Sequence, residues 1–344
     1  MNEIQPQLSL FEIGKFSVES LDLVVYEGEI LTLFGPSGSG KTTILRIIAG
    51  LEKPESGIVK FGDKIVSNSH IFVEPEDRKV GMVFQDSSLF PHLTVSQNVI
   101  FGLRKDNAAI KRERLDSMLN MTKLTGLEDR FPHQLSGGEQ QRVALARALA
   151  TNPSIILFDE PFANLDEQLR RSLLIDVRSI LKRRGITAVF VSHDPKDALS
   201  FSDRVAVLNK GKIEQVDSPE EVYTRPKNSF VANSLGHTNI IEVKTTKKGC
   251  KAFFGEICID HEFEVGKTGM ISLRPQWCLW NDEVYMSKAV VKNISYYGSC
   301  KEVTVKVHGC GNEVMIQTHS HKLIELNQEI GINFDIPELN IFQS

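Results

Sequence analysis

The sequence predicts a large α/β domain followed by a small all-β domain. Two short apolar runs, Ile30–Phe34 and residues 155–158, have the composition of strands buried inside a parallel sheet. After about Leu235 the pattern changes, and apolar residues alternate with polar ones as in half-buried antiparallel strands. A chain of 344 residues has room for two domains, and we place them at residues 1–235 and 236–344.

The composition is that of an ordinary globular protein. The formal net charge of −4, with no long basic run, does not favour nucleic-acid binding. No apolar run approaches the roughly 18 residues that cross a bilayer, and the N-terminus lacks the pattern of a signal peptide, so we expect a cytosolic chain. The cysteines contain no Cys-x-x-Cys pair and are expected to be reduced thiols: Cys250, Cys258, Cys278, Cys300 and Cys310.

The loop after the first run has the pattern of a P-loop. Residues 35–42 read GPSGSGKT, which fits G-x-x-x-x-G-K-[ST], and a helix is predicted next because apolar residues recur at helical spacing through TILRIIAGL. The glycines let backbone N–H groups turn inward toward a phosphate. Lys41 would reach the β- and γ-phosphates of ATP, and the Thr42 hydroxyl would bind Mg²⁺. The predicted ATP contacts in this loop are Gly35, Pro36, Ser37, Gly38, Ser39, Gly40, Lys41, Thr42 and Thr43.

Two carboxylates follow the second apolar run. Parallel strands in a nucleotide-binding sheet carry their chemistry at their carboxyl ends, where Asp159 and Glu160 stand. Asp159 would hold Mg²⁺, directly or through water, and Glu160 would orient or deprotonate the water that attacks the γ-phosphate. The alternative is a solvated acidic turn, which the upstream P-loop disfavours.

Two further polar residues follow β-branched segments. The stretch VFVSHDP reads as a third strand that ends at His193, and GMVFQDSSLF places Gln85 in the same way. A lone histidine is usually structural or superficial, but at this edge it could contact the same γ-phosphate. The Gln85 amide could bind Mg²⁺ or the attacking water.

A second candidate phosphate site lies about a hundred residues after the first. Residues 135–149 read LSGGEQQRVALARAL, a Ser-Gly-Gly turn that opens a helix. Taken alone, this pattern indicates a capping box, in which Ser136 caps the helix and Glu139 reaches back.

Together, these motifs resemble those of the ATPase subunits of ABC transporters. GPSGSGKTT, VFQD, LSGGEQQRVALARAL, ILFDEP, NLD and VSHD occur in the family's order, between about residues 28 and 211. The resemblance implies a P-loop NTPase core of ABC type and a head-to-tail homodimer. In that dimer Ser136, Gly137 and Gly138 of one subunit would touch the γ-phosphate of ATP held by the other subunit. Asp166 matches the family's D-loop, which lies across the dimer seam.

One expected residue departs from the family pattern. The family usually has an aromatic side chain, often tyrosine, that stacks on adenine and precedes the P-loop lysine. That tyrosine is absent here, which leaves Phe11 or Phe16, and the spacing favours Phe11. Either phenylalanine offers a π face for stacking.

Residues 95–134 match the helical subdomain of the family, because their sequence is amphipathic with helical spacing. Just before them, Leu89, Phe90 and Pro91 follow Gln85. Alone, this cluster is as compatible with a core as with a surface. In the family, the region forms the groove that receives a coupling helix of the integral membrane permease subunit.

The C-terminal part resembles the TOBE domain of binding-protein-dependent importers. Val303, Val305 and Val307 alternate with polar residues, and short strands with glycines between them fit a small OB-like barrel. ISLRPQ resembles the family's RPE element, with Gln276 in place of glutamate. OB folds often bind nucleic acid, but from Ile240 onward 11 Lys or Arg face 13 Asp or Glu, so we expect no nucleic-acid partner.

The predicted function is ATP hydrolysis that energises solute import at the cytoplasmic face of a bacterial inner membrane. The partners would be permease subunits and, through them, a periplasmic or lipoprotein solute-binding protein. VGMVFQDSSLFPHLTV favours ferric iron, and polyamine, sulfate, molybdate and sugar importers remain alternatives. A soluble ABC ATPase acting on DNA or the ribosome is disfavoured, because the chain has no heptad run and one set of motifs. A subunit without turnover is disfavoured by the complete catalytic set.

Overall fold

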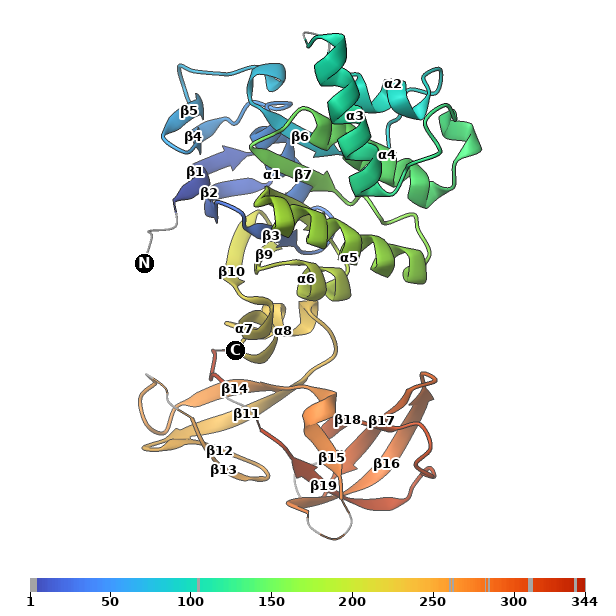
Figure 1. The fold of residues 1–344 in the computed structure, drawn as a ribbon. Coiled ribbons are helices and arrows are strands. Elements are labelled where there is room, and N and C mark those ends of the chain that lie inside the picture. The colour runs from blue at the N-terminus through green and yellow to red at the C-terminus, as the bar shows by residue number, and fades with distance from the viewer. Residues whose placement is uncertain are drawn as a thin grey trace. The chain divides into compact units, whose positions relative to one another are not determined.

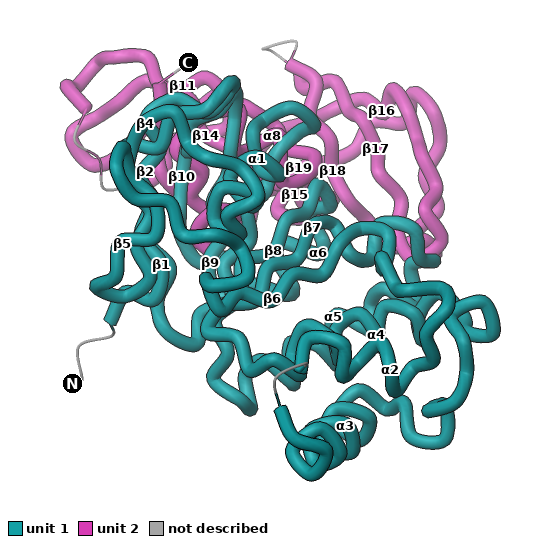
Figure 2. Tube along the Cα trace, turned by 90° about the horizontal axis from the view of Figure 1, so that it is seen from above, with its two compact units in different colours: residues 1–219 teal, residues 220–344 magenta. Residues whose placement is uncertain are grey.

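The computed structural model forms two compact units, residues 1–219 and 220–344 (Figures 1 and 2). The prediction of a large α/β part and a smaller β part is confirmed. No helix among the described residues is long and apolar enough to span a membrane. The structure describes residues 5–103, 106–259, 261, 263–281, 283, 285–308, 312–336 and 339–343.

The centre of the first unit is a six-stranded sheet in the order β10-β9-β3-β8-β7-β6. All neighbours pair in parallel except β10, which is antiparallel to β9. Both predicted strands are present. The strands are β3 (Ile30–Phe34), β6 (Val80–Val83), β7 (Ile155–Asp159), β8 (Thr187–Ser192), β9 (Arg204–Asn209) and β10 (Lys212–Asp217).

Both faces of this sheet are buried, as its continuous apolar strands require. Along β7, Ile156 and Phe158 pack into a core formed with the helices α4 and α5, whereas Ile155 and Leu157 pack into a second core on the opposite face. The alternation follows the two-residue period of a strand. The sheet is therefore held on both sides, which fixes the position of its strand ends.

A second, antiparallel sheet closes the other side of this unit. Its order is β2-β1-β4-β5, and helix α1 (Lys41–Ala49) contributes to the core that the two sheets share. α1 ends at Gly50 in a left-handed conformation, as helices commonly do. The strands are β1 (Pro6–Lys15), β2 (Val18–Tyr26), β4 (Ser56–Phe61) and β5 (Lys64–Ser67).

The remaining helices of this unit form a second layer. Residues 95–134 contain α2 and α3, which pack on α4 (Figure 1). Helices α5 and α6 cover the sheet beside them, and short 3₁₀ turns lie at Pro75–Asp77 and Pro132–Gln134. The helices are α2 (Val95–Ile100), α3 (Ala108–Thr122), α4 (Gly137–Ala150), α5 (Glu167–Arg184) and α6 (Pro195–Phe201).

The second unit is antiparallel throughout, as predicted. Its sheets have the orders β13-β12-β11-β14 and β15-β19-β16-β17-β18, and the edge strands β15 and β18 lie against each other, so the second sheet is nearly closed. Its elements are α7 (Pro219–Thr224), α8 (Ser229–Ser234), β11 (Asn239–Thr246), β12 (Gly249–Ala252), β13 (Gly255–Cys258), β14 (Thr268–Leu273), η3 (Pro275–Trp277), β15 (Cys278–Trp280), β16 (Ser287–Tyr296), β17 (Cys300–Val307), β18 (Glu313–His319) and β19 (Glu329–Phe334).

Arg274, the arginine of the RPQ element, joins the short helices to this β unit. It is fully buried, and its guanidinium donates to the carbonyl oxygens of Tyr223 (3.0 Å), Ala232 (2.9 Å) and Gly236 (3.1 Å). A buried charge needs such partners. The compact unit thus begins at Glu220, earlier than the change of sequence pattern near Leu235.

The described cysteines are free thiols. Burial raises the pKa of Cys250 to about 11 and that of Cys278 to about 12. Both thiols are therefore protonated at neutral pH and unreactive. Cys258 is exposed, Cys300 is half-buried, and Cys310 lies outside the described residues.

Candidate nucleotide site

The predicted site residues meet at one edge of the central sheet. Phe34 at the end of β3 pairs with Ser192 at the end of β8, and Asp159 at the end of β7 pairs with Val191. β6 is the next strand after β7. The ends of four neighbouring strands therefore align, as expected for ligand sites in parallel sheets. The residues that follow these ends include Gly35, Gln85, Glu160 and His193.

The P-loop holds its lysine in place. Lys41 is only 6% exposed, and its ammonium donates to the carbonyl oxygens of Gly35 (2.8 Å) and Pro36 (2.9 Å). Burial lowers the pKa of Lys41, and the charges of Glu160 and Asp159 oppose this shift. The ammonium is thus ordered beside the loop before any phosphate arrives, which reduces the entropic cost of binding.

Two glycines of the loop are required by their neighbours. A Cβ on Gly35 would lie 2.3 Å from the carbonyl oxygen of Leu208, and one on Gly40 would lie 2.8 Å from the Val18 side chain. Gly40 also has a φ of 99°, which favours glycine. The loop can follow this path only without side chains at these positions.

Thr42 and Asp159 form a pair of oxygen ligands. The Thr42 hydroxyl donates to Asp159 Oδ1 at 3.2 Å. Burial raises the pKa of Asp159, while the hydrogen bond from Thr42 lowers it. A divalent cation here would offset the cost of burying this carboxylate, and hydroxyl and carboxylate oxygens are ligands that Mg²⁺ prefers. The pair therefore fits the predicted metal.

Glu160 and His193 contact each other directly. His193 Nδ1 lies 2.9 Å from Glu160 Oε2, and the Glu160 side chain is 22% exposed. Glu160 has a φ of 45°, a left-handed conformation that is strained in a non-glycine residue and is typical of functional sites. The structure thus brings a carboxylate and an imidazole together at an accessible point beside the P-loop.

Gln85 follows β6 and is exposed. Its carbonyl oxygen accepts a hydrogen bond from the Gln141 side chain of α4 (3.2 Å). Arg147 of α4 donates to the carbonyl oxygens of Ser88 (2.8 Å) and Ser87 (3.2 Å). Helix α4 therefore fixes the segment after Gln85. Sequence reasoning missed these contacts, and the signal was a lone arginine within the apolar stretch RVALARAL.

The cluster that follows Gln85 is neither wholly core nor wholly surface. Leu89 is half-buried and packs against the core, Phe90 is half-buried, and Pro91 is exposed. The Arg147 guanidinium lies over the Phe90 ring, 5.5 Å from its centroid. The ring is therefore held by α4 while one side of the cluster faces solvent.

The capping interpretation of the Ser-Gly-Gly turn is confirmed. Ser136 caps α4, its N–H donates to Glu139 Oε2 at 2.7 Å, and its hydroxyl contacts the same carboxylate at 2.8 Å. A Cβ on Gly138 would lie 3.0 Å from the Leu169 side chain. In the described part of the chain, no hydrogen bond or ion pair links Ser136, Gly137 or Gly138 to the P-loop. Capping therefore does not explain the glycines.

The two candidate aromatics lie in different places. Phe11 lies within β1 and pairs with Ile58 of β4, and Lys60 lies over its ring. Phe16 lies in the turn between β1 and β2, is 78% exposed, and precedes Ser17 and Val18, which approach Gly40. The geometry therefore favours Phe16 over Phe11, against the expectation from spacing.

Asp166 begins helix α5. Its Oδ1 accepts a hydrogen bond from the Leu169 N–H at 2.9 Å, so it acts as an N-cap in this chain. One turn later, Arg170 donates to Asp194 at 2.7 Å, and Asp194 caps α6 directly after His193. The starts of α5 and α6 are therefore tied together beside the site.

A parallel sheet with a P-loop, an aspartate beside the P-loop threonine and a glutamate–histidine pair defines a P-loop ATPase domain. A family model described as "ABC transporter" matches residues 18–163. The ferric-ion import ATP-binding protein FbpC of Escherichia coli K12 is 39% identical over 310 residues, covering 89% of this chain and 87% of FbpC. The chain therefore belongs to the ATP-binding proteins of ABC transporters, in the group of import ATP-binding proteins, and is an ATPase.

Other members of the group match with different cargo names. The sulfate/thiosulfate import ATP-binding protein CysA 2 of Rhizobium meliloti is 46% identical over 248 residues, 70% of this chain and 66% of CysA 2. The spermidine/putrescine import ATP-binding protein PotA of Acetivibrio thermocellus is 43% identical over 263 residues, 75% of this chain and 74% of PotA. These matches leave the cargo open.

Two solved structures match the first unit. The ATP-binding cassette MJ0796, described as a dimer in a post-hydrolysis state with ADP and Pi, is 33% identical with a TM-score of 0.54, and the match covers 62% of this chain and 98% of MJ0796. CbiO1 of Clostridium perfringens, described as part of the ABC transporter complex cbiONQ, is 29% identical with a TM-score of 0.60, and the match covers 63% of this chain and 90% of cbiO1. Both carry the same fold.

Proposed function

We propose that this chain is the ATP-hydrolysing subunit of an ABC importer for ferric iron. The observation that carries the cargo is the length of the match to FbpC. An alignment of 310 residues extends well into the second unit, because the first unit ends at residue 219. The sulfate and polyamine relatives are more identical but align over 248 and 263 residues. Sulfate and polyamines are therefore the second candidates.

Two copies of the chain would form the working unit. In the proposed head-to-tail dimer, the first turn of α4 in one copy faces the γ-phosphate on the P-loop of the other. The exposed N–H groups of a helix start suit an anion, and Ser136 and Gly137 are exposed. Asp166 would lie at the seam. MJ0796, a relative of the first unit, has been solved as a dimer. Hydrolysis would remove the bridging charge and let the dimer open.

Hydrolysis would use the residues at the sheet edge. Lys41 would bind the β- and γ-phosphate oxygens, and Thr42, Asp159 and Gln85 would hold Mg²⁺, which when bound neutralises phosphate charge. Glu160 would take the proton of the water whose oxygen attacks the γ-phosphorus, and ADP would leave as the bond to the β-phosphate breaks. His193, 2.9 Å from Glu160, would hold that carboxylate in position and contact the γ-phosphate.

Adenine would stack on Phe16, because that ring lies nearest in the chain to the residues that contact the P-loop. We expect Phe16→Ala to raise the KM for ATP about tenfold, since aromatic stacking on a base contributes about 1–3 kcal/mol. Phe11→Ala is the matched control and should leave KM unchanged. Steady-state ATPase kinetics measure both, and the opposite pattern would return the assignment to Phe11.

The partners would be integral membrane permease subunits at the cytoplasmic face of a bacterial inner membrane, served by a periplasmic or lipoprotein solute-binding protein. The half-exposed cluster of Leu89, Phe90 and Pro91 would receive a coupling helix of the permease. We expect no nucleic-acid partner. Tagged Glu160→Gln chain, purified from membranes with Mg·ATP, should bring multi-span subunits with it.

The cargo is tested by uptake in cells that naturally make the chain. Deleting the chain should abolish uptake of radiolabelled ferric iron and spare uptake of sulfate and spermidine. The wild-type chain should restore iron uptake, whereas Glu160→Gln should not, and the exposed Glu27→Gln is the control. Loss of sulfate or spermidine uptake with normal iron uptake would replace iron with that cargo.

A further inference from the structure

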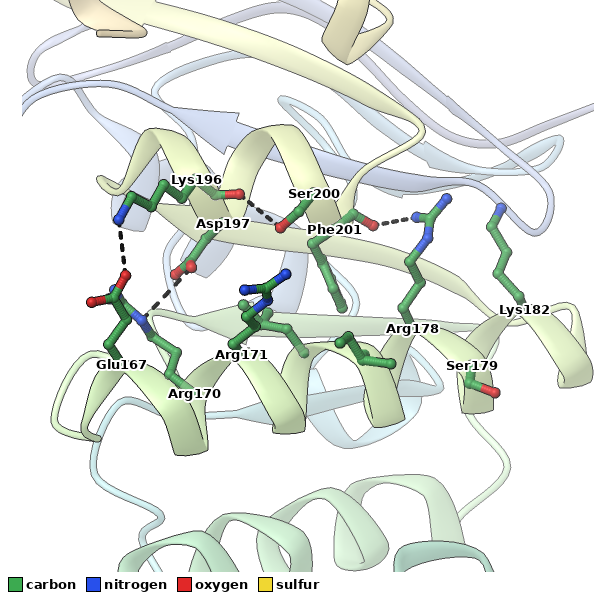
Figure 3. Close-up of a pocket in the computed structure, with 12 residues that line it drawn as sticks. Glu167, Arg170, Arg171, Arg178, Ser179, Lys182, Lys196, Asp197, Ser200 and Phe201 are labelled. Carbon is green, nitrogen blue, oxygen red and sulfur yellow. Dashed lines mark hydrogen bonds and ion pairs between the residues drawn. The ribbon is translucent and has the colours of Figure 1, made fainter. Parts of the chain in front are cut away.

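A cavity of about 660 Å³ lies between helices α5 and α6, within the first unit (Figure 3). We call it the α5–α6 groove. Ligand sites in proteins usually have volumes of about 300–1,000 Å³. None of the residues proposed to bind ATP lines it. One stripe of α5, at positions 167, 170, 171, 174, 175, 178, 179 and 182, faces four residues of α6: Lys196, Asp197, Ser200 and Phe201.

The middle of the groove is apolar. Leu174 and Phe201 are 5% and 1% exposed, so they form a closed floor, whereas Ile175 is 62% exposed at the rim. An aliphatic side chain so far exposed beside a buried floor gives a partner apolar surface to cover, at about 25 cal/mol per Å².

The rim of the groove is basic, and most of its cations are already paired. Lys196 pairs with Glu167 at 2.8 Å, and Arg178 with Asp203 at 3.0 Å. Arg171 differs. It is exposed and projects into the space between the two helices, and no hydrogen bond or ion pair to it is seen within the described part of the chain (Figure 3). The groove thus combines an apolar floor with one available guanidinium.

The dimensions of the groove select the shape of the occupant. The stripe from residue 167 to residue 182 is about 22 Å long at 1.5 Å per residue. An α-helix, about 10–12 Å across, would need well over roughly 1,000 Å³ along that length. The volume of about 660 Å³ excludes a helix and admits one extended chain.

We propose that the α5–α6 groove binds a single-chain aliphatic carboxylate of the fatty-acid type. The carboxylate pairs with Arg171, and the aliphatic chain covers Ile175 and the floor formed by Leu174 and Phe201. A charge-assisted hydrogen bond from a guanidinium to a carboxylate is the stronger kind. The alkyl chain supplies the remaining affinity by burial.

Occupancy of this groove has a path to the catalytic edge. Arg170, next to Arg171, donates to Asp194 at 2.7 Å, and Asp194 caps α6 directly after His193. A carboxylate beside Arg171 competes for Arg170 and weakens this pair. Bound ligand therefore lowers ATP turnover. This second step rests on the proposed role of His193, whereas binding itself does not.

The test is isothermal titration of the full chain with sodium decanoate, without nucleotide. We expect saturable binding of one decanoate per chain. Arg171→Glu should weaken it at least about tenfold, the size of one charge-assisted contact. Arg183→Glu makes the same charge change on α5 outside the groove and should leave binding unchanged. Equal affinity in Arg171→Glu and Arg183→Glu would overturn the proposal.

Further arms separate the chemistry from its alternatives. Ile175→Asp should also weaken binding, and because Ile175 and Arg171 are both exposed, neither change should lower the melting temperature. Decanol and decyltrimethylammonium should bind at least about tenfold more weakly than decanoate. Binding to anionic phospholipid vesicles without binding of decanoate would assign the groove to a membrane surface and overturn the proposal. Loss of ATPase inhibition with binding intact would remove only the path through Arg170.

Discussion

The two loops proposed to contact nucleotide phosphates are built in different ways. The P-loop surrounds a lysine that is 6% exposed, and a Cβ on Gly35 would lie 2.3 Å from the carbonyl oxygen of Leu208. The signature loop, residues 136–138, is the first turn of a helix, closed by the capping box of Ser136 and Glu139. One loop is shaped by buried backbone, and the other by a hydrogen bond to its own helix.

This difference teaches which loop is complete within one chain. The P-loop has its cation, a hydroxyl and a carboxylate in contact with one another at Lys41, Thr42 and Asp159. The signature loop has its cap and, among the described residues, no contact with the P-loop. We infer that the signature loop completes a site in another copy. Each prediction below tests this contrast, from the largest expected effect to the smallest.

Removing the lysine should abolish the first loop's function. We expect Lys41→Ala to weaken ATP binding and turnover by about 100-fold or more, because the buried ammonium is the main charge opposite the phosphates. The melting temperature should hold, since no buried ion pair is broken. Equilibrium binding of a fluorescent ATP analogue measures the loss, and Lys64→Ala, at an exposed site, is the control. Normal ATP binding by Lys41→Ala would contradict the assignment of the P-loop.

Changing the signature serine should separate capping from phosphate contact. Aspartate caps a helix about as well as serine, so Ser136→Asp should change the free energy of unfolding by less than about 1 kcal/mol. Its charge would repel a γ-phosphate, and we expect turnover to fall about 100-fold while ATP still binds the P-loop. Asn107→Asp changes the cap of α3 in the same way and should be silent. Equal turnover in both variants would leave capping as the only role of Ser136.

Glycines of the P-loop should differ in their effect on folding. Gly35→Ala should lower the free energy of unfolding by about 3 kcal/mol, because its Cβ would meet fixed backbone. Gly38→Ala should cost about 1 kcal/mol, since its φ of 80° is strained for alanine but no atom lies within 4 Å. Urea unfolding of the nucleotide-free chain gives both values. Equal costs would mean that close backbone contact does not shape the loop.

The two regions should respond to pH in opposite directions. Near the catalytic edge, burial raises the pKa of Asp197 to about 6. The folded chain then holds this proton more tightly than the unfolded chain, so stability falls as pH rises from about 4 to 6. At the signature loop, hydrogen bonds from Ser136 lower the pKa of Glu139, so its contribution is present above about pH 4.5 and lost as pH falls.

Two variants measure this contrast by urea unfolding. Asp197→Asn should gain up to about 3 kcal/mol over the wild-type chain between pH 4 and 7. Glu139→Gln should lose less than about 1 kcal/mol at pH 7 and match the wild type in acid. Parallel pH profiles for all three chains would refute the assigned environments.

The sequence predicted the local features well and the long-range ones poorly. The strand ends and the P-loop were visible because apolar runs and glycine spacing are local. Phe11 was preferred to Phe16 because spacing assumes a regular strand, whereas β1 has irregular pairing after Leu10 and Glu12 is left-handed. Arg147 and Arg274 bind carbonyl groups distant in sequence, which no local pattern reveals.

The central inference is that the two loops serve different nucleotides, and mixing two inactive chains tests it directly. Lys41→Ala and Ser136→Asp chains are each expected to be inactive alone. In a mixed head-to-tail dimer, the intact P-loop of one chain meets the intact signature loop of the other. An equal mixture should therefore recover about one quarter of wild-type turnover, because about half of random pairs are mixed and each has one intact site. No recovery, with mixed dimers shown to form, would mean that both loops act on the same nucleotide within one chain.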